Sequence, residues 1–236
     1  MEITARDRHQ KIEAYPVVKC PLSHSFKEAF SSAKKYVVKR PSRWSTPESP
    51  VTFVRLLYDE KYLYCGFELE KDTFKKNALL SPADGGKWAK ENSVPERMQS
   101  LLQDDRCECF IWPVRPGSLS EQHYFAFEVT RGGAAVQSRT RFYRKFDFNF
   151  DGKIVAKSVE PGGGKSIDAK VALDAFVFAV PWSSVSSSKT MGQYRIGLFR
   201  GTRDRGGDFR WASVVDPEDE KIDFHRPETF GLLCFV

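Results

Sequence analysis

The segment Asp147–Gly152 (DFNFDG) has the residue types and spacing that open a calcium-binding EF-hand loop. In such a loop Asp147, Asn149 and Asp151 would supply oxygen ligands to the cation. The bidentate glutamate that closes the loop is replaced by Ser158, and no flanking helices are evident. Phenylalanines alternate with these polar residues, which is also typical of a strand that ends in an Asp-Gly turn. A structural calcium ion and a simple turn therefore both stay open.

The other residue types that perform catalysis occur without the spacing that catalysis needs. None of the four histidines lies at a metal-ligand spacing, and no Gly-x-Ser-x-Gly nucleophile turn occurs. The run GGGKS at 162–166 is similar to part of a phosphate-binding loop, but Val159 stands where that motif needs its first glycine. No paired acid–base or nucleophile arrangement is left. We therefore expect a protein that binds a ligand and is not an enzyme.

Two groups of basic residues could form an anion-binding surface, because the arginine fork fits phosphate and sulfate. The groups are Arg139, Arg141, Arg144 and Lys145, and Arg200, Arg203, Arg205 and Arg210. The alternative is that each group lies on a separate, solvated strand face. The formal net charge is +6, but lysine and arginine are spread along the whole chain, which indicates solubility rather than a nucleic-acid partner. An anionic or protein partner stays open.

The elements that must position these residues are mostly strands. Two apolar runs, Val51–Tyr58 and Tyr62–Leu69, flank the turn-forming tripeptide at 59–61 (DEK). Their length and their β-branched and aromatic residues predict a β-hairpin. Both runs are almost continuously apolar, which indicates burial on two faces at the centre of a sheet. The residues that we expect to be buried are Leu56, Leu63 and Cys65.

The rest of the chain predicts an all-β fold with little helix. Further strands are predicted at Asp104–Pro113, Tyr124–Thr130, Ala134–Asp147, Asp174–Trp182, Tyr194–Arg200, Phe209–Val215 and Phe230–Val236. Short helices are predicted within Ser23–Val38, where a long connection is the alternative, and at Pro95–Leu102. So many strands favour an antiparallel two-sheet β-sandwich with jelly-roll or immunoglobulin-like connections. Residues 51–236 would form this domain, and residues 1–50 an N-terminal segment that packs on it.

The cysteines and the N-terminus indicate an intracellular protein. The first residues lack the apolar stretch of a signal peptide, and no apolar run is long enough to span a membrane. Five cysteines are an odd number, and four lie in apolar, strand-like runs. A free cysteine in such a run behaves as a small hydrophobe. We expect all five to be reduced, as in an intracellular compartment.

Six short motifs occur in a fixed order along the predicted strands. They are Val54–Tyr64 (VRLLYDEKYLY), Asp105–Phe110 (DRCECF), Phe125–Val129 (FAFEV), Val177–Val185 (VFAVPWSSV), Trp211–Ser213 (WAS) and His225–Gly231 (HRPETFG). In this order the chain resembles the family 9 carbohydrate-binding modules and their DOMON-like relatives over most of residues 51–236. The resemblance implies a non-catalytic β-sandwich that binds sugar at chain ends.

The family holds a sugar between two tryptophans while glutamate and arginine side chains hydrogen-bond its hydroxyls, since the sugar ring has apolar faces and a polar rim. Glu108 matches the family glutamate. The two tryptophan positions fall on Leu102 and Phe224, and the arginine position falls on Glu128. Trp112, on the same strand face as Glu108, could replace a missing tryptophan. With the adjacent histidine, the predicted ligand-binding residues are Glu108, Trp112, Phe224, His225 and Glu128.

The departures from the family pattern leave three functions open. The first is binding of a sugar or another polyhydroxyl ligand. The second is a degenerate sandwich that binds a protein or an anion, which the replacements at Leu102 and Glu128 favour. The third is a haem-binding electron-transfer domain, because related sandwiches hold haem on a similar face. Its axial ligands would be drawn from Met98, Met191, His123 and His225. Trp182 and Trp211 match family positions at which core packing is expected.

Overall fold

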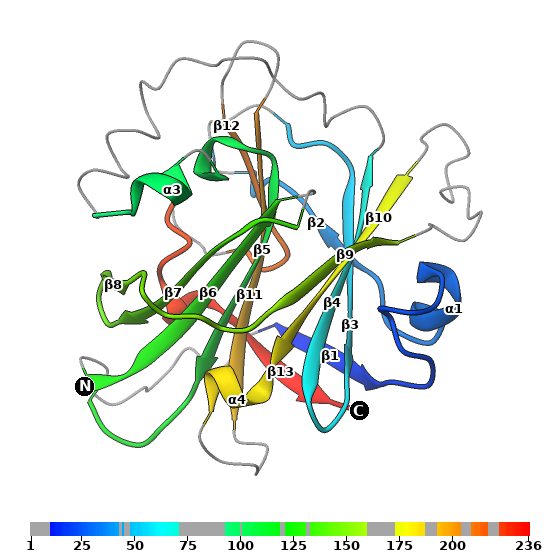
Figure 1. Cartoon of the computed structure of the whole chain (residues 1–236), viewed down its shortest axis with the longest axis horizontal. Helices are drawn as coiled ribbons and strands as arrows, with labels where there is room; N and C mark the ends of the chain where they lie inside the picture. The colour runs from blue at the N-terminus through cyan, green and yellow to red at the C-terminus, as the bar shows by residue number, and fades with distance from the viewer. Residues whose placement is uncertain are drawn as a thin grey trace.

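The structure of the protein is a computed structural model that describes residues 10–42, 44, 48–70, 93–99, 101–118, 121–130, 133–159, 173–186, 193–203, 209–216 and 222–236. These residues form an all-β fold with three short α-helices (Figure 1). The strands are β1 (Lys11–Pro16), β2 (Tyr36–Val38), β3 (Thr52–Tyr58), β4 (Tyr62–Glu70), β5 (Arg106–Pro113), β6 (His123–Thr130), β7 (Ala135–Arg141), β8 (Lys145–Asp147), β9 (Val155–Val159), β10 (Leu173–Pro181), β11 (Tyr194–Arg203), β12 (Phe209–Ser213) and β13 (Gly231–Phe235). The helices are α1 (Phe26–Phe30), α3 (Glu96–Gln99) and α4 (Trp182–Val185).

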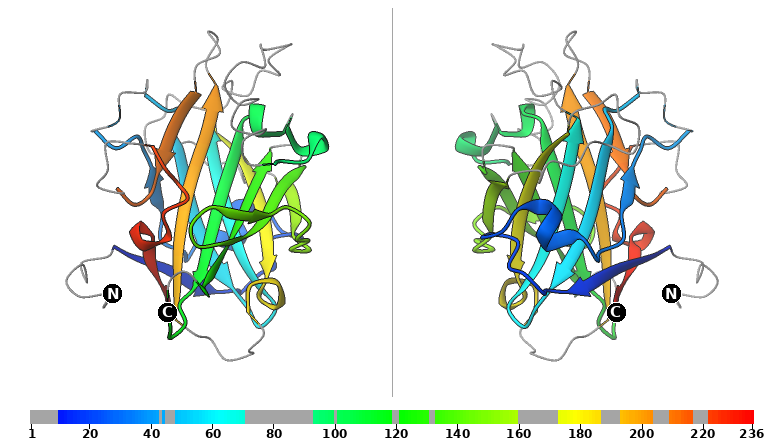
Figure 2. Two further views of the ribbon diagram at one scale, coloured as in Figure 1. Left: turned by 90° about the vertical axis from the view of Figure 1, so that its left-hand side faces the viewer. Right: turned by 90° about the vertical axis from the view of Figure 1, so that its right-hand side faces the viewer.

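The described strands form one continuous curled sheet in the order β8-β7-β6-β5-β11-β13-β1-β3-β4-β10-β9. In addition, β12 pairs with β11 and β2 pairs with β3. We call the strands from β8 to β13, with β12, the β5 half, and those from β3 to β9, with β2, the β4 half. Figure 1 shows the β5 half on the left and the β4 half on the right. The sheet curls so that the two halves face each other across a common core (Figure 2).

Strand β1 joins the two halves, and this differs from the predicted arrangement. Residues 11–14 pair in parallel with β13, and Tyr15 and Pro16 pair in parallel with β3. The predicted pair of separate antiparallel sheets is therefore not confirmed, because one strand belongs to both halves. The N-terminal segment, which we expected to pack on the domain, contributes β1 and β2 to the sheet. Its short strands carry too few residues to show a clear alternation in the sequence.

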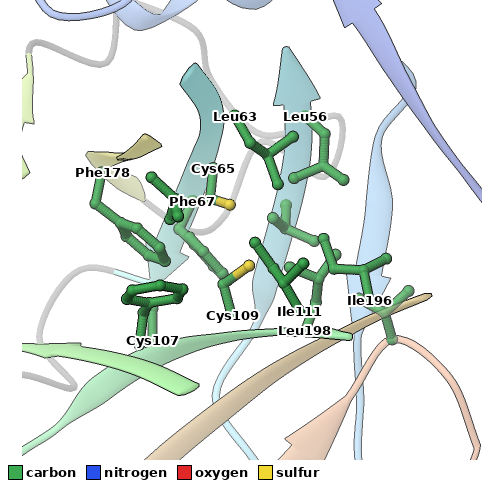
Figure 3. Close-up of a cluster of buried hydrophobic side chains, with 14 of the residues drawn as sticks. Leu56, Leu63, Cys65, Phe67, Cys107, Cys109, Ile111, Phe178, Ile196 and Leu198 are labelled. Atoms are coloured by element: carbon green, nitrogen blue, oxygen red, sulfur yellow. The ribbon is translucent and has the colours of Figure 1, made fainter. Parts of the chain in front are cut away.

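The predicted hairpin is confirmed as β3 and β4. Side chains of Leu56, Leu63 and Cys65 have no exposed surface and point into the core between the halves. There they meet Cys109, Ile111 and other side chains of the β5 half (Figure 3). Burial of these apolar side chains removes them from water, which is the main driving force for bringing the halves together.

The hairpin turn is held by the side chain of Asp59. Its Oδ1 accepts hydrogen bonds from the backbone N–H groups of Lys61 and Tyr62, at 2.8 and 2.7 Å. Its Oδ2 accepts one from the Tyr64 hydroxyl at 2.8 Å. An aspartate that satisfies turn N–H groups in this way fixes the register of the following strand.

Helix α1 explains why β4 is apolar on both faces. The helix lies outside β3 and β4 (Figure 2, right), and Phe26 and Phe30 stack on each other with ring centroids 4.6 Å apart. They pack over Gly66, where a Cβ atom would lie only 2.5 Å from the Phe30 ring. The helix begins at a capping box in which Ser25 and Glu28 satisfy each other's backbone N–H groups. The helix predicted within Ser23–Val38 is thus confirmed.

A buried arginine connects the halves at one end of the core. Arg200 of β11 is fully buried, and its Nε and Nη2 each donate to a carboxylate oxygen of Asp105 at 2.9 Å. Its Nη1 donates to the hydroxyl of Thr52 on β3 at 3.2 Å. The guanidinium therefore links β11 with the first residue of β3, which lies in the opposite half.

The Leu63→Ala substitution is expected to lower the free energy of unfolding by about 2–5 kcal/mol, because it leaves a cavity between the halves. Urea unfolding of the two proteins measures the difference. Val18→Ala is a matched control, since Val18 is 81% exposed and its truncation leaves no cavity. A loss below about 1 kcal/mol at Leu63 would contradict its assignment to the core.

The five cysteines are all free thiols, and three of them are buried in the core. We expect a thiol count of the unfolded, unreduced protein to find all five. Cys65 and Cys109 are neighbours across the core, and burial raises the pKa of the Cys65 thiol, which disfavours the thiolate that disulfide formation needs. Recovery of fewer thiols from freshly purified protein would contradict the expectation of a reducing compartment.

Candidate functional site

The site predicted around Glu108 lies on the outer face of the β5 half. Alternation along β5 directs Cys107, Cys109 and Ile111 into the core between the halves, and Glu108, Phe110 and Trp112 to the other side. That other side is covered. The outer cluster that lies there consists of Trp44, Phe110, Trp112, Tyr124, Ala126, Phe199, Phe224 and Phe230, with Trp211 partly buried against it. The outer face of β5 is therefore buried rather than in contact with water.

Glu108 forms a charged cluster with two neighbours, which we call the Arg106 cluster. Glu108 and Glu128 are directly opposite each other on β5 and β6. The Nε of Arg106 lies 3.0 Å from Oε1 of Glu108 and 2.8 Å from Oε2 of Glu128. All three side chains are more than nine-tenths buried. One guanidinium nitrogen thus faces two carboxylates that water does not reach.

The hydrogen bonds of the Arg106 cluster are divided unequally. Nε of Arg106 donates to Glu128, and Nη1 donates to the carbonyl oxygen of Leu102 at 2.8 Å. Oε1 of Glu108 is close to Nε as an ion pair but accepts no hydrogen bond from a described group. A buried carboxylate oxygen without a donor is destabilising, so it is a place where a ligand hydroxyl could bind.

Burial changes the protonation of both glutamates. Loss of hydration raises the pKa of Glu108 to about 8, the charge of Glu128 adds to the rise, and the charge of Arg106 opposes it. Burial also raises the pKa of Glu128 above its usual range, against the lowering effect of Arg106. One arginine does not compensate two buried carboxylates, so a proton is held more tightly here than in the unfolded chain.

Trp211 of β12 covers the Arg106 cluster. Across the strands Arg106 is paired with Gly201, and Gly201 is paired with Trp211. A Cβ atom on Gly201 would lie 2.7 Å from the indole, so only glycine lets the ring cross β11. The indole then lies with its ring centre 5.2 Å from the Arg106 guanidinium carbon, a cation–π contact. Among the aromatic side chains of the outer cluster, Trp211 alone keeps partial exposure.

The two positions that the resemblance assigned to sugar-stacking tryptophans are both packed. Phe224 is stacked on Phe199 with ring centroids 4.0 Å apart and meets Trp211 edge to face at 5.1 Å. Leu102 is buried in a separate cluster with Phe148 and other apolar side chains. Phe224 therefore adjoins the Arg106 cluster through Trp211, whereas Leu102 contributes its carbonyl oxygen.

His225 is a buried, neutral histidine. Its Nδ1 is 3.0 Å from the hydroxyl of Tyr124, and its ring stacks on Phe110 at 5.1 Å. Burial lowers the pKa of His225 to about 3, and the charges of Arg144 and Arg106 act in the same direction. The ring therefore carries no charge at neutral pH.

Trp112 is committed to packing within the outer cluster. Its Nε1 donates to Oε1 of Gln122 at 2.9 Å, and the guanidinium of Arg195 lies over its ring at 5.8 Å. On β5, Trp112 lies two strand repeats beyond Glu108, so it is not the aromatic that covers the carboxylate. That aromatic is Trp211, which we expected to serve core packing.

The structure therefore gathers only part of the predicted set. It brings Glu108 and Glu128 together, with Phe224 beside them. Sequence reasoning missed Arg106 and Trp211 as their partners. The alternation of β5 does place Arg106 on the same face as Glu108, so a signal for it existed. Nothing in the sequence indicates that the Trp211 side chain lies over Gly201 and so reaches Arg106 and Glu108.

The residues considered for calcium have other partners. Oδ2 of Asp147 accepts from Arg139 at 2.8 Å, and Oδ1 accepts from the backbone N–H of Asn149 at 3.1 Å. Asp151 accepts from the backbone N–H of Lys153 at 3.0 Å and forms an ion pair with its amine. Within the described ranges, no three His, Cys, Asp or Glu side chains lie close enough together to hold a metal ion. The donor set does not fit a calcium loop.

Two arginines of the first basic group are held in separate ion pairs. Arg139 pairs with Asp147 at 2.8 Å, and Arg144 pairs with Asp223 at 2.5 Å. The guanidinium groups of Arg139 and Arg144 thus each face a different carboxylate.

In the second basic group, Arg200 is buried at the end of the core, and Arg210 donates to the carbonyl oxygen of Glu48 at 3.0 Å. Arg205 and the side chain of Arg203 lie outside the described residues. Arg200 is thus a structural connection between the halves rather than part of an exposed basic surface.

Of the residues named for haem ligation, His225 is the buried histidine beside Tyr124 and Phe110. Met98 packs against the cluster that contains Leu102, His123 is exposed on β6, and Met191 lies outside the described residues. Nothing in the part of the chain that the structure describes favours haem. Among the same residues, no helix has the length and apolar character needed to cross a membrane.

The fold is that of the family 9 carbohydrate-binding modules. A protein of Bacteroides uniformis described as a "putative carbohydrate-binding protein" matches 97% of this chain and 100% of its own length, with a TM-score of 0.66 and 12% identity. A family 9 module from Caldicellulosiruptor kristjanssonii matches 96% of this chain in its complexes with cellotriose and with glucose. The matches cover 93% and 96% of those chains, with TM-scores of 0.59 and 0.58 and identities of 10% and 12%.

No family model matches the sequence, and no curated protein matches it. The comparisons with solved structures therefore concern the fold, and the ligand has to be argued from the residues of this chain.

We expect the stability of the protein to fall as the pH rises through about 8. Burial raises the pKa of Glu108 to about 8, so the folded protein binds this proton more tightly than the unfolded chain does. The resulting gain in stability is complete below the pKa of an unfolded glutamate, and it is lost as the pH rises to the folded value. Urea unfolding between about pH 5 and about pH 9 measures this slope. In Glu108→Gln, which stays neutral at every pH, the slope should flatten. A Glu68→Gln control removes a carboxylate that is paired with Arg55 outside the cluster. Parallel profiles for the wild type and Glu108→Gln would contradict the assignment.

Proposed function

We propose that this protein is a non-catalytic carbohydrate-binding protein whose ligand is a sugar or another polyhydroxyl compound. The observation that carries the proposal is the similarity of fold, over nearly the whole chain, to carbohydrate-binding structures that include one with cellotriose and one with glucose. The proposed site is the Arg106 cluster with Trp211, on the outer face of the β5 half. Glu108 stands there at the position of the family glutamate.

The chemistry of the cluster supports a hydroxyl-bearing ligand. No described residue donates a hydrogen bond to Oε1 of Glu108, whose near neighbour is the ion-paired Nε of Arg106, and a sugar hydroxyl would supply a donor. Trp211 keeps partial exposure directly above the cluster, and an indole face suits the apolar face of a sugar ring. Because Glu108 is buried, the ligand would contact the indole of Trp211 first. It would then reach the Glu108 carboxylate beside the edge of the indole ring. In the proposal, Phe224 supports the indole, Glu128 holds Arg106, and His225 and Trp112 pack behind them.

A second candidate is the degenerate sandwich that binds a protein or an anion. The observation that favours it is the burial of all five predicted site residues, each at most 9% exposed. A glycan array run beside a panel of phosphates and polyanions separates the two functions. Binding to glycans alone supports the first, and binding to polyanions alone supports the second.

Glu108→Gln is expected to weaken binding to any glycan that the array identifies by roughly tenfold or more. Above the pKa of Glu108, about 8, a ligand hydroxyl donates to an ionised acceptor, and such a hydrogen bond contributes about 1.5–3 kcal/mol, whereas the amide never ionises, so the loss is measured at about pH 9. Isothermal titration calorimetry with the identified glycan measures the loss. Glu68→Gln, far from the site on β4, should bind like the wild type. Equal affinity of Glu108→Gln and the wild type would place the sugar elsewhere on the protein.

A further inference from the structure

Three adjacent strands at one end of the sheet carry a row of basic side chains that the Arg106 cluster does not use. The strands are β6, β7 and β8, which lie side by side at the left of Figure 1. His123 of β6 is paired directly with Arg141 of β7, and Arg141 is paired directly with Lys145 of β8. Residues directly opposite each other on antiparallel strands project from the same face, with Cβ atoms about 4.5–5.5 Å apart. We call these three residues the basic row.

The basic row is open to solvent. All three of its side chains are exposed. The next residue of β6 on the same face is Phe125, which is only 8% exposed and packs in the core between the halves. The row therefore begins where this core ends, and a ligand can reach it without displacing any apolar side chain.

Charges of one sign accumulate in the basic row. Like charges directly opposite each other in a sheet are destabilising, yet Arg141 is opposite Lys145. Within the described residues, no carboxylate forms an ion pair with either of these two side chains. The next pair on the same two strands is matched, because Arg139 is opposite Asp147 and forms an ion pair with it at 2.8 Å. The protein thus compensates the charge beside the row but not the charges of the row.

A fourth basic residue is held beside the row by a buried glutamine. Gln122 precedes His123 in the chain and is 8% exposed. Its Nε2 donates to the carbonyl oxygen of Arg115 at 2.9 Å, and its Oε1 accepts from the backbone N–H of Arg115 at 3.3 Å. Partial burial lowers the pKa of His123, and the charges of Arg115 and two other arginines lower it further. The electrostatic potential around the row is therefore positive.

The form of the basic row suits an extended polyanion. Cationic or hydrogen-bonding groups on three neighbouring strands offer contacts at a regular spacing to a chain that crosses the strands. The arginine fork binds an oxyanion such as sulfate through two parallel hydrogen bonds. Single-stranded nucleic acids instead stack their bases on exposed aromatic rings, and the aromatic residue beside the row on this face, Phe125, is buried.

We propose that the basic row, with Arg115 beside it, binds a sulfated polysaccharide at a site separate from the Arg106 cluster. Strand alternation places His123 and Glu128 on opposite faces of β6, so the two sites do not share a surface. The choice of a carbohydrate as the carrier of the charges rests on the proposed function, whereas the anionic character of the ligand rests on the row itself.

The test uses the full-length protein, with heparin as the sulfated probe and chemically desulfated heparin as its less charged counterpart. Calorimetry at several salt concentrations measures the affinities. We expect the wild type to bind the desulfated form at least roughly tenfold more weakly than heparin, because fewer counterions are released. The ring signals of His123 in NMR spectra should shift when heparin is added, and those of the buried His225 should not.

The variant that removes the charges of the row is Arg141→Gln combined with Lys145→Gln. We expect it to bind heparin roughly tenfold or more weakly, and the plot of log affinity against log salt concentration to become shallower by about one for each cation removed. Lys27→Gln combined with Lys61→Gln is the matched control, since it removes the same charge from exposed positions on α1 and in the β3–β4 turn. The control should bind heparin like the wild type. Unfolding midpoints verify that both variants are folded.

Equal heparin affinity of the folded row variant and the wild type would overturn the inference, and so would equal binding of the desulfated form. Tighter binding of duplex DNA, or of vesicles that contain phosphatidylserine, would overturn it in favour of that partner. Neutral glycans test the proposed function, and the row variant should bind them like the wild type. Binding of neutral glycans without heparin would overturn the inference alone. Binding of heparin through the row without any neutral glycan would support the row and overturn the proposed function.

Discussion

Strand β1 divides its backbone hydrogen bonds between two partners, and the continuity of the sheet from one half to the other depends on this division. Its first residues extend the β5 half beside β13, and Tyr15 and Pro16 extend the β4 half beside β3. A single strand therefore makes the sheet continuous between β13 and β3, and both of these strands are paired where the two halves meet. A strand shared by the two halves removes the exposed edges that each half would otherwise present here, where backbone groups could pair with other chains.

A buried ion pair is a second connection between the halves that β1 joins. Arg200 joins β11 to the start of β3 through Asp105 and Thr52. A fully buried guanidinium is costly to leave unpaired, so this contact opposes any separation of the halves. The large common core does most of the stabilising, and the arginine specifies how the two halves meet.

The outer faces are covered as well, and this gives the candidate site its character. Helix α1 covers β4, and the outer cluster with Phe224 and Phe230 covers β5 and β11. Glu108 is thus enclosed where a simple sandwich would leave it in water. Enclosure concentrates the electrostatics, because a charge at Glu128 or Arg106 acts on Glu108 with little screening. Gly201 completes the enclosure of the Arg106 cluster, because a residue without a side chain leaves room for the Trp211 indole to lie over it.

Much of the fold could be predicted from local patterns. The apolar runs of β3 and β4, the Asp59 turn and the alternation of β5 and β6 are local properties of the chain, and each gave the right element in about the right place. The order of short motifs was enough to indicate the family 9 fold. Glu108 and Glu128 could be chosen as candidates because strand alternation and motif position concern neighbouring residues.

What the sequence alone determined is therefore the set of strands, the central hairpin and the strand faces on which the candidate residues lie. Only the tertiary structure decided that β1 joins the halves, that the outer face of β5 is buried, and that Arg106 and Trp211 complete the cluster around Glu108. These features depend on contacts between residues far apart in the chain, such as Gly201 with Trp211 and Arg106 with Glu128. A periodic pattern tells which way a side chain points, but what it meets there is set by how distant strands pack.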